Sequence, residues 1–227
     1  MFKGLTITAV IFIILIVFGE IFLPTLAERN VLAILQAEAP AEKAVAEIKA
    51  RPAFSLLFGR VDGLHIQAKT AMLGKINVTD LDIRGGNIRL DMAQLLSDKR
   101  LRINSADKLT LHGTIREDAL AAALQKKVDK IKDVAVEITP ETVKITGNVP
   151  LAGRKVDVAI EGNVVAADGG LYFHLRQVNI RNALLGKALV GNLFEDIMLA
   201  DLRTSPFQLE ATDVVQKAGA IVITLNR

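Results

Sequence analysis

The sequence predicts an α+β fold, in which a curved antiparallel sheet is wrapped on two amphipathic helices and preceded by an N-terminal transmembrane helix. Three observations predict it. An apolar run from Leu5 to Ala27 opens the chain. After Phe54, apolar and polar residues alternate with the period of two that is typical of strands with one buried face. Two later segments switch to helical periodicity, and strand runs separated by single helices favour an antiparallel sheet.

The N-terminal run contains one charged residue, Glu20, in 23 residues. At about 1.5 Å per residue, a helix of this length extends roughly 34 Å, enough to cross a hydrocarbon core. Lys3 precedes the run, which favours a cytoplasmic N-terminus and export of the remainder. We therefore predict a single-pass protein of the cell membrane, with an anchor or signal over residues 1–29 and an extracytoplasmic domain over residues 30–227.

Two interpretations of the run remain open. A cleavable signal peptide would have its apolar region from Leu5 to Phe18 and small residues at Thr25 and Ala27 before the cut. A retained anchor is favoured because the apolar region continues past the length usual for removed signals. Glu20 is either an intramembrane functional residue or, as we favour, a carboxylate near the outer interface, one turn before Pro24.

Composition excludes several classes of function. The net charge of +3 and the pI of about 9.2 come from scattered Lys and Arg without a dense basic run, and the chain has one Tyr and no Trp. Nucleic acid is therefore not an expected partner. Without cysteine, disulfides and thiolate chemistry are impossible. Apolar residues make up 51% of the chain and aromatic residues only 4%, so the apolar excess is aliphatic.

The first half of the exported part is predicted to be mainly strands. The anchor helix should continue outward and end at Pro40, and residues 41–51 fit either helix or strand. Alternation then marks strands around residues 64–68, 76–83, 88–92 and 101–111. Its parity changes at Thr79-Asp80, which predicts a β-bulge, and Gly85-Gly86-Asn87 has the composition of a turn.

The second half is predicted to contain both helices. Thr114 and Glu117 have the spacing of a capping box, and the face behind them carries Leu120, Leu124, Val128 and Ile131. A second helix is expected from Ala183 to Met198, with Leu185, Leu189, Leu193 and Ile197 on one face. Strands are expected around residues 134–145, 156–180, 207–212 and 220–225, with turns at 139–141, 167–170 and 217–219 and a second bulge at Arg176-Gln177.

No motif in the sequence indicates catalysis. His65, His112 and His174 are isolated from one another and from carboxylates at metal-ligand spacing. Gly85-Gly86 and Gly169-Gly170 are not followed by a helix start, which a phosphate-binding loop requires. We expect a protein that is not an enzyme and holds neither a metal nor another cofactor.

The segment from Phe54 to Asp62 is unusually apolar and follows Arg51-Pro52. Its short, bounded run favours a buried strand that enters the core. The alternative is an apolar lip that meets a membrane or an acyl chain.

The chain resembles the LmeA-like phospholipid-binding envelope proteins in three segments. They are Arg-Pro-x-x-x-Leu-Leu-x-Gly-Arg-Val-Asp at 51–62, Ile-x-Leu-Asp-x-x-x-Leu-Leu at 88–96, and Thr-x-x-Glu-Asp-x-Leu at 114–120. The resemblance covers nearly the whole chain. It implies a membrane-tethered extracytoplasmic domain that binds phospholipid in a groove between curved sheet and helices. It also favours strand over helix for residues 44–51.

These observations lead to the hypothesis of a membrane-tethered phospholipid-binding protein of the cell envelope, with phospholipid and membrane as partners. Lipid transfer is an extension of this hypothesis. Acyl chains need an apolar lining without reactive groups, and scarce aromatics leave room between aliphatic walls. The residues expected to contact lipid are Phe54, Leu57, Phe58, Arg60, Leu120, Leu124, Leu185 and Leu189, with Arg60 near the phosphate. The alternative is a non-enzymatic structural adaptor of an envelope complex.

Overall fold

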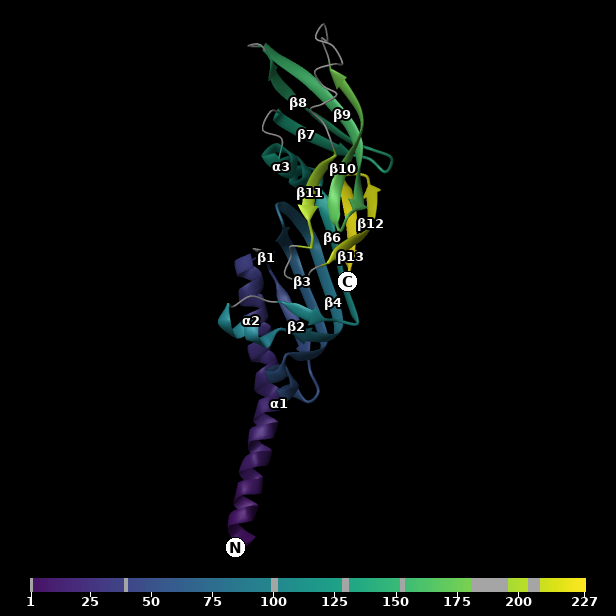
Figure 1. Cartoon of the computed structure of the whole chain (residues 1–227). Helices are drawn as coiled ribbons and strands as arrows, with labels where there is room; N and C mark the ends of the chain where they lie inside the picture. The colour runs from purple at the N-terminus through teal and green to yellow at the C-terminus, as the bar shows by residue number, and fades with distance from the viewer. Residues whose placement is uncertain are drawn as a thin grey trace.

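The computed structural model of the chain describes residues 2–38, 41–98, 102–127, 131–151, 154–180, 196–203 and 209–227. The molecule is elongated: helix α1 leaves it at one end, and two antiparallel sheets follow one another along its long axis (Figure 1). This arrangement confirms the predicted α+β class with antiparallel, curled sheet. The strands form two sheets, where the sequence had suggested one.

Helix α1 (Phe2–Glu38) is continuous through Pro24 and ends just before Pro40, the residue predicted to end it. Its outer half extends away from the sheets, and its C-terminal half packs on them, with Val31 buried. The side chains of α1 are described from Ile16 onward. Among the described residues, no helix is long and apolar enough to cross a membrane. The spanning segment from Leu5 to Ala27 therefore stays a prediction.

The first sheet, sheet A, has eight strands. They are β1 (Ala41–Glu42), β2 (Val45–Lys49), β3 (Arg60–Leu73), β4 (Ile76–Leu90), β5 (Ile103–Ser105), β6 (Lys108–Arg116), β12 (Glu210–Lys217) and β13 (Ala220–Asn226). The order is β1-β3-β4-β6-β13-β12, with β2 also paired to β3 and β5 to β4. Strand β2 answers the question left open for residues 41–51 in favour of strand, as the family resemblance implied.

The second sheet, sheet B, has five strands in the order β11-β10-β9-β8-β7. They are β7 (Lys132–Ile138), β8 (Val143–Leu151), β9 (Arg154–Ala167), β10 (Gly170–Ile180) and β11 (Ile197–Asp201). The predicted turn at 167–170 joins β9 to β10, with positive φ at Asp168 and Gly169, the geometry that two-residue hairpin turns favour.

Both predicted bulges are present. The register of β4 on β6 shifts between Thr79 and Asp82, and Asp80 between them has φ 53°. The register of β10 on β9 shifts between Leu175 and Gln177. At each place the extra residue moves the apolar side chains back to the buried face.

The turn predicted at Gly85-Gly86-Asn87 is wrong, because these residues lie inside β4, and the β3–β4 hairpin turns at Gly74-Lys75. A Cβ at Gly85 would lie 2.7 Å from Ile88 Cδ1 and 2.8 Å from Leu109 Cδ1. The absence of a side chain at Gly85 therefore leaves space for the side chains of Ile88 and Leu109, and the chain does not turn there.

Helix α3 (Glu117–Lys127) buries Leu120 and Leu124, as the periodicity predicted. The predicted capping box is wrong, because Thr114 remains in β6 opposite Val222. The Glu117 carboxylate instead accepts a hydrogen bond of 2.8 Å from the backbone N–H of Ile138, which ties the start of α3 to β7.

The second predicted helix, Ala183 to Met198, lies mostly outside the described residues, which resume at Asp196. Its last two residues are wrong as helix, because Ile197 and Met198 pair with β10 as part of β11. Of the two amphipathic helices predicted to pack on the sheet, the described residues therefore show one, α3. The C-terminal half of α1 also packs on the sheets.

The β12–β13 hairpin links the two sheets. The side-chain carbonyl of Gln216 accepts from the backbone N–H of Val164 at 3.0 Å and from Asn163 Nδ2 at 3.3 Å. The N–H of Gly219 donates to the carbonyl of Ile138 at 2.9 Å. Sheet B is therefore held by hydrogen bonds to the far end of sheet A, opposite the end from which α1 leaves (Figure 1).

Candidate functional site

An apolar groove of about 640 Å³ lies at the α1 end of sheet A. It is bounded by α1, by the 3₁₀ helix η1 (Ala53–Phe58), by the end of β4 and by α2 (Met92–Ser97). The lining is Leu23, Leu26, Ala27, Asn30, Val31, Ala33, Ile34, Ala37, Ile48, Leu56, Leu57, Val61, Leu90, Met92 and Leu95. Asn30 is the one polar residue in this set, and its Nδ2 donates to the Leu26 carbonyl within the helix at 2.9 Å. Such a lining suits acyl chains.

Two carboxylates hold α1 in place as one wall of the groove. Glu20 Oε1 accepts from the backbone N–H of Ala53 at 2.8 Å, and Glu28 Oε1 accepts from that of Ile48 at 3.1 Å. Both donors are main-chain groups at the edge of the domain that no strand partner satisfies. The helix is thereby fixed at two points, at the start of η1 and on β2.

The opposite wall is η1, and its shape depends on Gly59. This residue caps η1 with φ 71° and donates its N–H to the Leu56 carbonyl at 3.0 Å. A Cβ there would lie 2.6 Å from the Leu90 carbonyl oxygen, so the turn requires glycine. The Gly59 carbonyl accepts from Leu90 N–H at 2.8 Å, which joins η1 to the end of β4.

The sequence had favoured a buried strand for this apolar segment, and that interpretation is wrong. In η1 only Ala53 is fully buried, whereas Phe54, Leu57 and Phe58 are 51%, 60% and 71% exposed. A 3₁₀ helix of six residues cannot turn all its apolar side chains inward, because its period of three distributes them around the axis. The exposed geometry is the one that the alternative interpretation, an apolar lip, requires.

Two arginines lie beside η1 on neighbouring strands. Arg60 of β3 pairs directly with Arg89 of β4, and both line a second hollow, of about 740 Å³, together with Phe54, Phe58 and Leu90. In the described part of the chain neither guanidinium has an ion-pair partner. Like charges directly opposite on a sheet repel, so an anion between them would be favourable.

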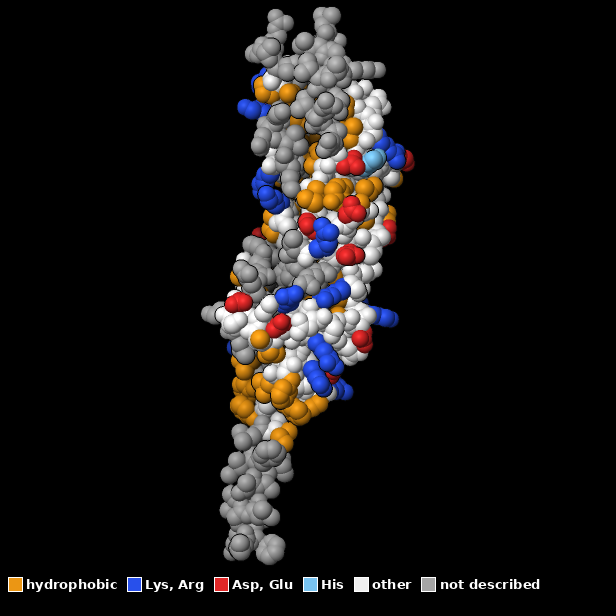
Figure 2. Space-filling view, in the orientation of Figure 1, with side chains coloured by type: hydrophobic (Ala, Val, Ile, Leu, Met, Phe, Trp, Pro, Cys, Tyr) orange, Lys and Arg blue, Asp and Glu red, His pale blue; other side chains and the backbone are white. Residues whose placement is uncertain are grey.

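The two hollows are adjacent, since Leu90 lines both. Figure 2 shows the corresponding surface, where hydrophobic side chains gather at the α1 end of the domain and Lys and Arg side chains lie next to them. Chemically, this end of the molecule combines an apolar groove with an adjacent pair of cations. A ligand with a long apolar part and an anionic group matches both features.

The predicted lipid-contacting residues fall into three groups. Phe54, Leu57, Phe58 and Arg60 lie together at this site. Leu120 and Leu124 are 0% and 2% exposed in the core beneath α3 and do not line either hollow, so the structure does not place them with the others. Leu185 and Leu189 lie outside the described residues.

Sequence reasoning missed Arg89, the inner face of α1 and α2. Arg89 was missed because the β3–β4 turn was expected at 85–87. A turn at Gly74-Lys75 sets the register that places Arg89 opposite Arg60. The signal that could have located α2 is Asp91, because Asp is a preferred N-cap residue. In the structure its carboxylate accepts a hydrogen bond from Gln94 N–H at 3.0 Å.

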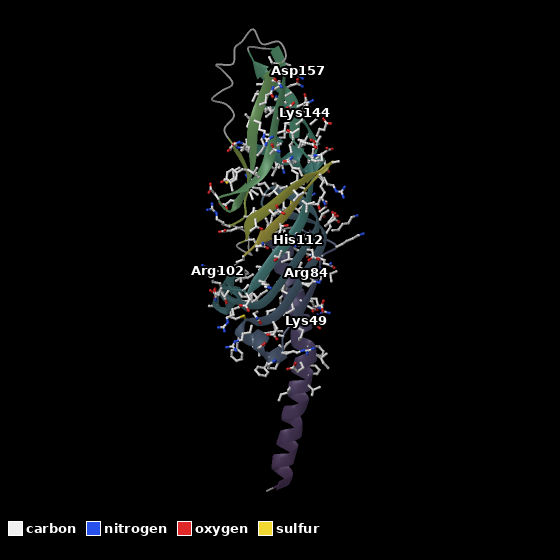
Figure 3. All side chains as sticks on the ribbon, turned by 90° about the vertical axis from the view of Figure 1, so that its right-hand side faces the viewer. Lys49, Arg84, Arg102, His112, Lys144 and Asp157 are labelled. Carbon is white, nitrogen blue, oxygen red and sulfur yellow. The ribbon has the colours of Figure 1, made fainter. Side chains whose placement is uncertain are left out.

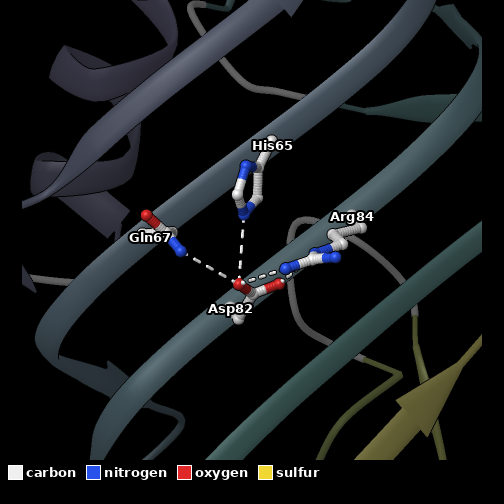
Figure 4. Close-up of polar contacts among 4 residues, drawn as sticks. All are labelled: His65, Gln67, Asp82 and Arg84. Atoms are coloured by element: carbon white, nitrogen blue, oxygen red, sulfur yellow. Dashed lines mark hydrogen bonds and ion pairs between the residues drawn. The ribbon is translucent and has the colours of Figure 1, made fainter.

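A cluster of four polar side chains lies elsewhere, on the solvent-facing side of sheet A (Figure 4). Asp82 accepts hydrogen bonds from Arg84 Nε at 2.8 Å and Gln67 Nε2 at 3.2 Å, and its carboxylate lies 3.0 Å from His65 Nε2. The Arg84 hydrogen bonds above all hold the pKa of Asp82 well below its usual range. The carboxylate is fully engaged by its neighbours and lines neither hollow.

The other polar side chains spread along the length of both sheets (Figure 3). His112 of β6 contacts Thr224 Oγ1 of β13 at 3.1 Å, and His174 of β10 pairs with Asp196 at 2.9 Å. Among the residues that the structure describes, no group of three or more His, Cys, Asp or Glu is placed to hold a metal ion.

Comparisons with known proteins agree with the character of the groove. The family model for LmeA-like phospholipid-binding proteins matches residues 19–226. A search of curated proteins found no match, and a search of solved structures found none either. The family match begins in α1 next to Glu20 and runs to the end of β13, so it includes both walls of the groove. The chain belongs to the LmeA-like phospholipid-binding family.

Proposed function

We propose that this protein binds a phospholipid with its acyl chains in the groove between α1 and η1 and its phosphate near Arg60 and Arg89. Family membership supports phospholipid binding. The observation that carries the location is the contact between the two hollows: one is almost wholly apolar, and the other contains two cations without ion-pair partners in the described chain. Each acyl methylene that enters the groove would contribute about 0.8 kcal/mol before ordering costs.

The second part of the proposal is that α1 tethers the domain to the membrane. Glu20 contacts the domain and Leu23, Leu26 and Ala27 line the groove, so the spanning part of α1 ends earlier than the predicted Ala27, and residues 2–19 extend beyond the domain. At 1.5 Å per residue they measure about 27 Å, close to the thickness of a hydrocarbon core. Lys3 at the free end favours a cytoplasmic N-terminus, which places both sheets on the extracytoplasmic side of the cell membrane.

With this topology the groove opens beside the bilayer. An acyl chain leaving the outer leaflet would enter between α1 and η1 without crossing water. The protein would then hold lipid for exchange with the membrane, and we propose no chemical step, in keeping with a non-enzymatic role. The adaptor of an envelope complex becomes the preferred function if lipid is not bound.

The test of lipid binding is purification of the full chain in mild detergent, organic extraction and mass spectrometry of the extract. Stoichiometric phospholipid is expected. Ala33→Phe fills the groove from an exposed position of α1 and should remove the bound lipid. The matched control, Ala122→Phe on the exposed face of α3, should keep it. If lipid is absent from the wild type, and a fluorescent phospholipid does not bind the folded protein, the proposal is wrong.

The tether has a separate test. A reporter that is active only after export, fused behind Arg227, should be active, and the protein should resist carbonate extraction from membranes. A soluble protein that begins near Glu28 would show instead that the N-terminal segment is removed as a signal peptide.

A further inference from the structure

The apolar side chains of η1 line the two hollows, yet they also leave a large exposed apolar surface that the proposed lipid site does not cover. Phe54, Leu57 and Phe58, which we call the lip, project three large apolar side chains from one six-residue element. Leu56, the other large apolar residue of η1, is partly buried and lines the groove. Exposed apolar side chains that gather on one element mark an interaction surface more often than scattered ones do.

The lip is held rigidly. Ser55 N–H donates to the Pro52 carbonyl at 2.9 Å, Gly59 N–H donates to that of Leu56 at 3.0 Å, and Ala53 N–H donates to Glu20 at 2.8 Å. These bonds close both ends of η1 and attach it to α1. They fix the backbone of η1, so the three side chains leave it from set positions on the exposed side.

The apolar surface continues from the lip onto α1. Ile16, Val17, Phe18, Ile21 and Phe22 are 45–66% exposed, and they lie within one to two turns of Glu20, which contacts the start of η1. Figure 2 shows this surface as one hydrophobic region where the helix emerges. An occupant of the lip must therefore also accept the adjoining surface of α1.

The border of the lip is basic. Arg51, Arg60 and Arg89 are exposed around it, and none has an ion pair in the part of the chain that the structure describes. Three carboxylates lie nearby: Asp62 accepts a hydrogen bond from the backbone N–H of Arg51, Glu20 accepts one from the backbone N–H of Ala53, and Asp107 lines a hollow together with Arg60 and Arg89. Apolar side chains bordered by arginines fit an interface where hydrocarbon lies beneath phosphate groups.

We propose that the lip inserts into the outer leaflet of the bilayer and docks the domain against the membrane at a fixed height. The occupant is the lipid surface itself. The inference rests on the proposed tether, because the lip and the emerging α1 share one end of the molecule. It goes beyond that tether, since the tether attaches the domain to the membrane through α1 alone and requires no second contact.

The chain has no tryptophan, so one introduced tryptophan is a unique probe. Phe58→Trp, at the most exposed lip position, is placed in the full chain and reconstituted into vesicles of phosphatidylglycerol and phosphatidylcholine. Brominated lipids then report its depth. We expect a blue-shifted emission that is quenched most by bromines near the headgroup end of the acyl chain. The control Val215→Trp, 43% exposed on β12 in the other half of the molecule, should keep the emission of a tryptophan in water.

A bound lipid in the groove could also quench Phe58→Trp, so the measurement is repeated in the Ala33→Phe background. Quenching that persists there comes from the bilayer and supports the lip, whether or not lipid co-purifies. Quenching that disappears comes from groove lipid, which would support the proposed function and overturn the lip. An unquenched, water-like spectrum at Phe58→Trp and also at Leu57→Trp overturns the lip as well, and leaves the extraction test of lipid binding unaffected.

Discussion

The carboxylate of Glu20 in α1 accepts a hydrogen bond of 2.8 Å from the backbone N–H of Ala53, the first residue of η1. This bond links the segment predicted to cross the membrane with the element that forms one wall of the apolar groove. A charged residue in an otherwise apolar run is thereby explained by its partner in the domain, while its place at the outer membrane interface stays a prediction.

Glu20→Ala should loosen η1 without unfolding the domain. A hydrogen bond to a charged group contributes about 1.5–3 kcal/mol when sheltered, and less here because Glu20 is exposed. Hydrogen exchange of the full chain in detergent should show faster exchange over residues 53–58. Glu20→Gln keeps an acceptor and should fall between the wild type and Glu20→Ala. Unchanged exchange in both variants would mean that the bond does not hold η1.

Leu124→Ala should destabilise the domain by about 2–5 kcal/mol, because Leu124 is 2% exposed beneath α3 and its truncation leaves a cavity. Lys126→Ala on the exposed side of the same helix should change the free energy of unfolding by less than about 0.5 kcal/mol. Urea denaturation of both variants measures the difference. Similar small effects at the two positions would show that α3 is not packed through this face.

The alternation of apolar residues predicted most of the sheet correctly. It located both bulges, at Thr79-Asp80 and Arg176-Gln177, because an extra residue must change the parity of the buried face. It failed at Gly85-Gly86, since a glycine pair has the same appearance in a turn as in a strand where neighbouring side chains need its space. That choice depends on Ile88 and on Leu109, a residue of another strand.

The site was predictable only in part for the same reason. The apolar character of Phe54 to Phe58 was visible, but its exposure was not, because burial depends on whether a neighbour covers it. The groove arises from α1 contacting η1 across 33 residues of sequence at Glu20 and Ala53, and no local pattern encodes that contact. The lipid-contacting role expected for Leu120 and Leu124 rested on helical periodicity, which finds a packed face but cannot distinguish a core from a cavity.

Gly162 of β9 provides a test of the packing against sheet B. A Cβ there would lie 2.6 Å from Phe173 Cζ and would also meet the backbone carbonyl oxygen of His174. Gly162→Ala must move the strand or the buried phenyl ring, which should cost about 1–3 kcal/mol. Gly86→Ala in β4 has its nearest neighbour at 3.8 Å and should cost less than about 0.5 kcal/mol. Thermal unfolding of the two variants compares them, and equal melting temperatures would contradict the tight packing at Gly162.

Asp82 should make stability depend on pH in the acid range. Its pKa is lowered in the folded state, first by the Arg84 hydrogen bonds and then by those from His65 and Gln67. The ionised carboxylate is therefore the form that the fold favours. Its stabilisation is present above the ordinary pKa of 3.8 and is lost as the pH falls below it. Since the cluster lies at the surface, Asp82→Asn should cost about 1 kcal/mol or less at pH 7.

That cost should shrink progressively as the pH falls from about 5 toward the acid limit, because the unfolded wild type takes up a proton at Asp82 below pH 3.8 while the folded carboxylate, whose pKa is lowered, stays ionised to a lower pH. Urea midpoints of wild type and Asp82→Asn across this range measure it. Asp213→Asn is the matched control: it removes an exposed carboxylate of β12 that has no ion pair in the described chain, and it should leave the acid dependence of the wild type in place. A difference between wild type and Asp82→Asn that stays constant with pH would show that Arg84 does not stabilise the ionised carboxylate.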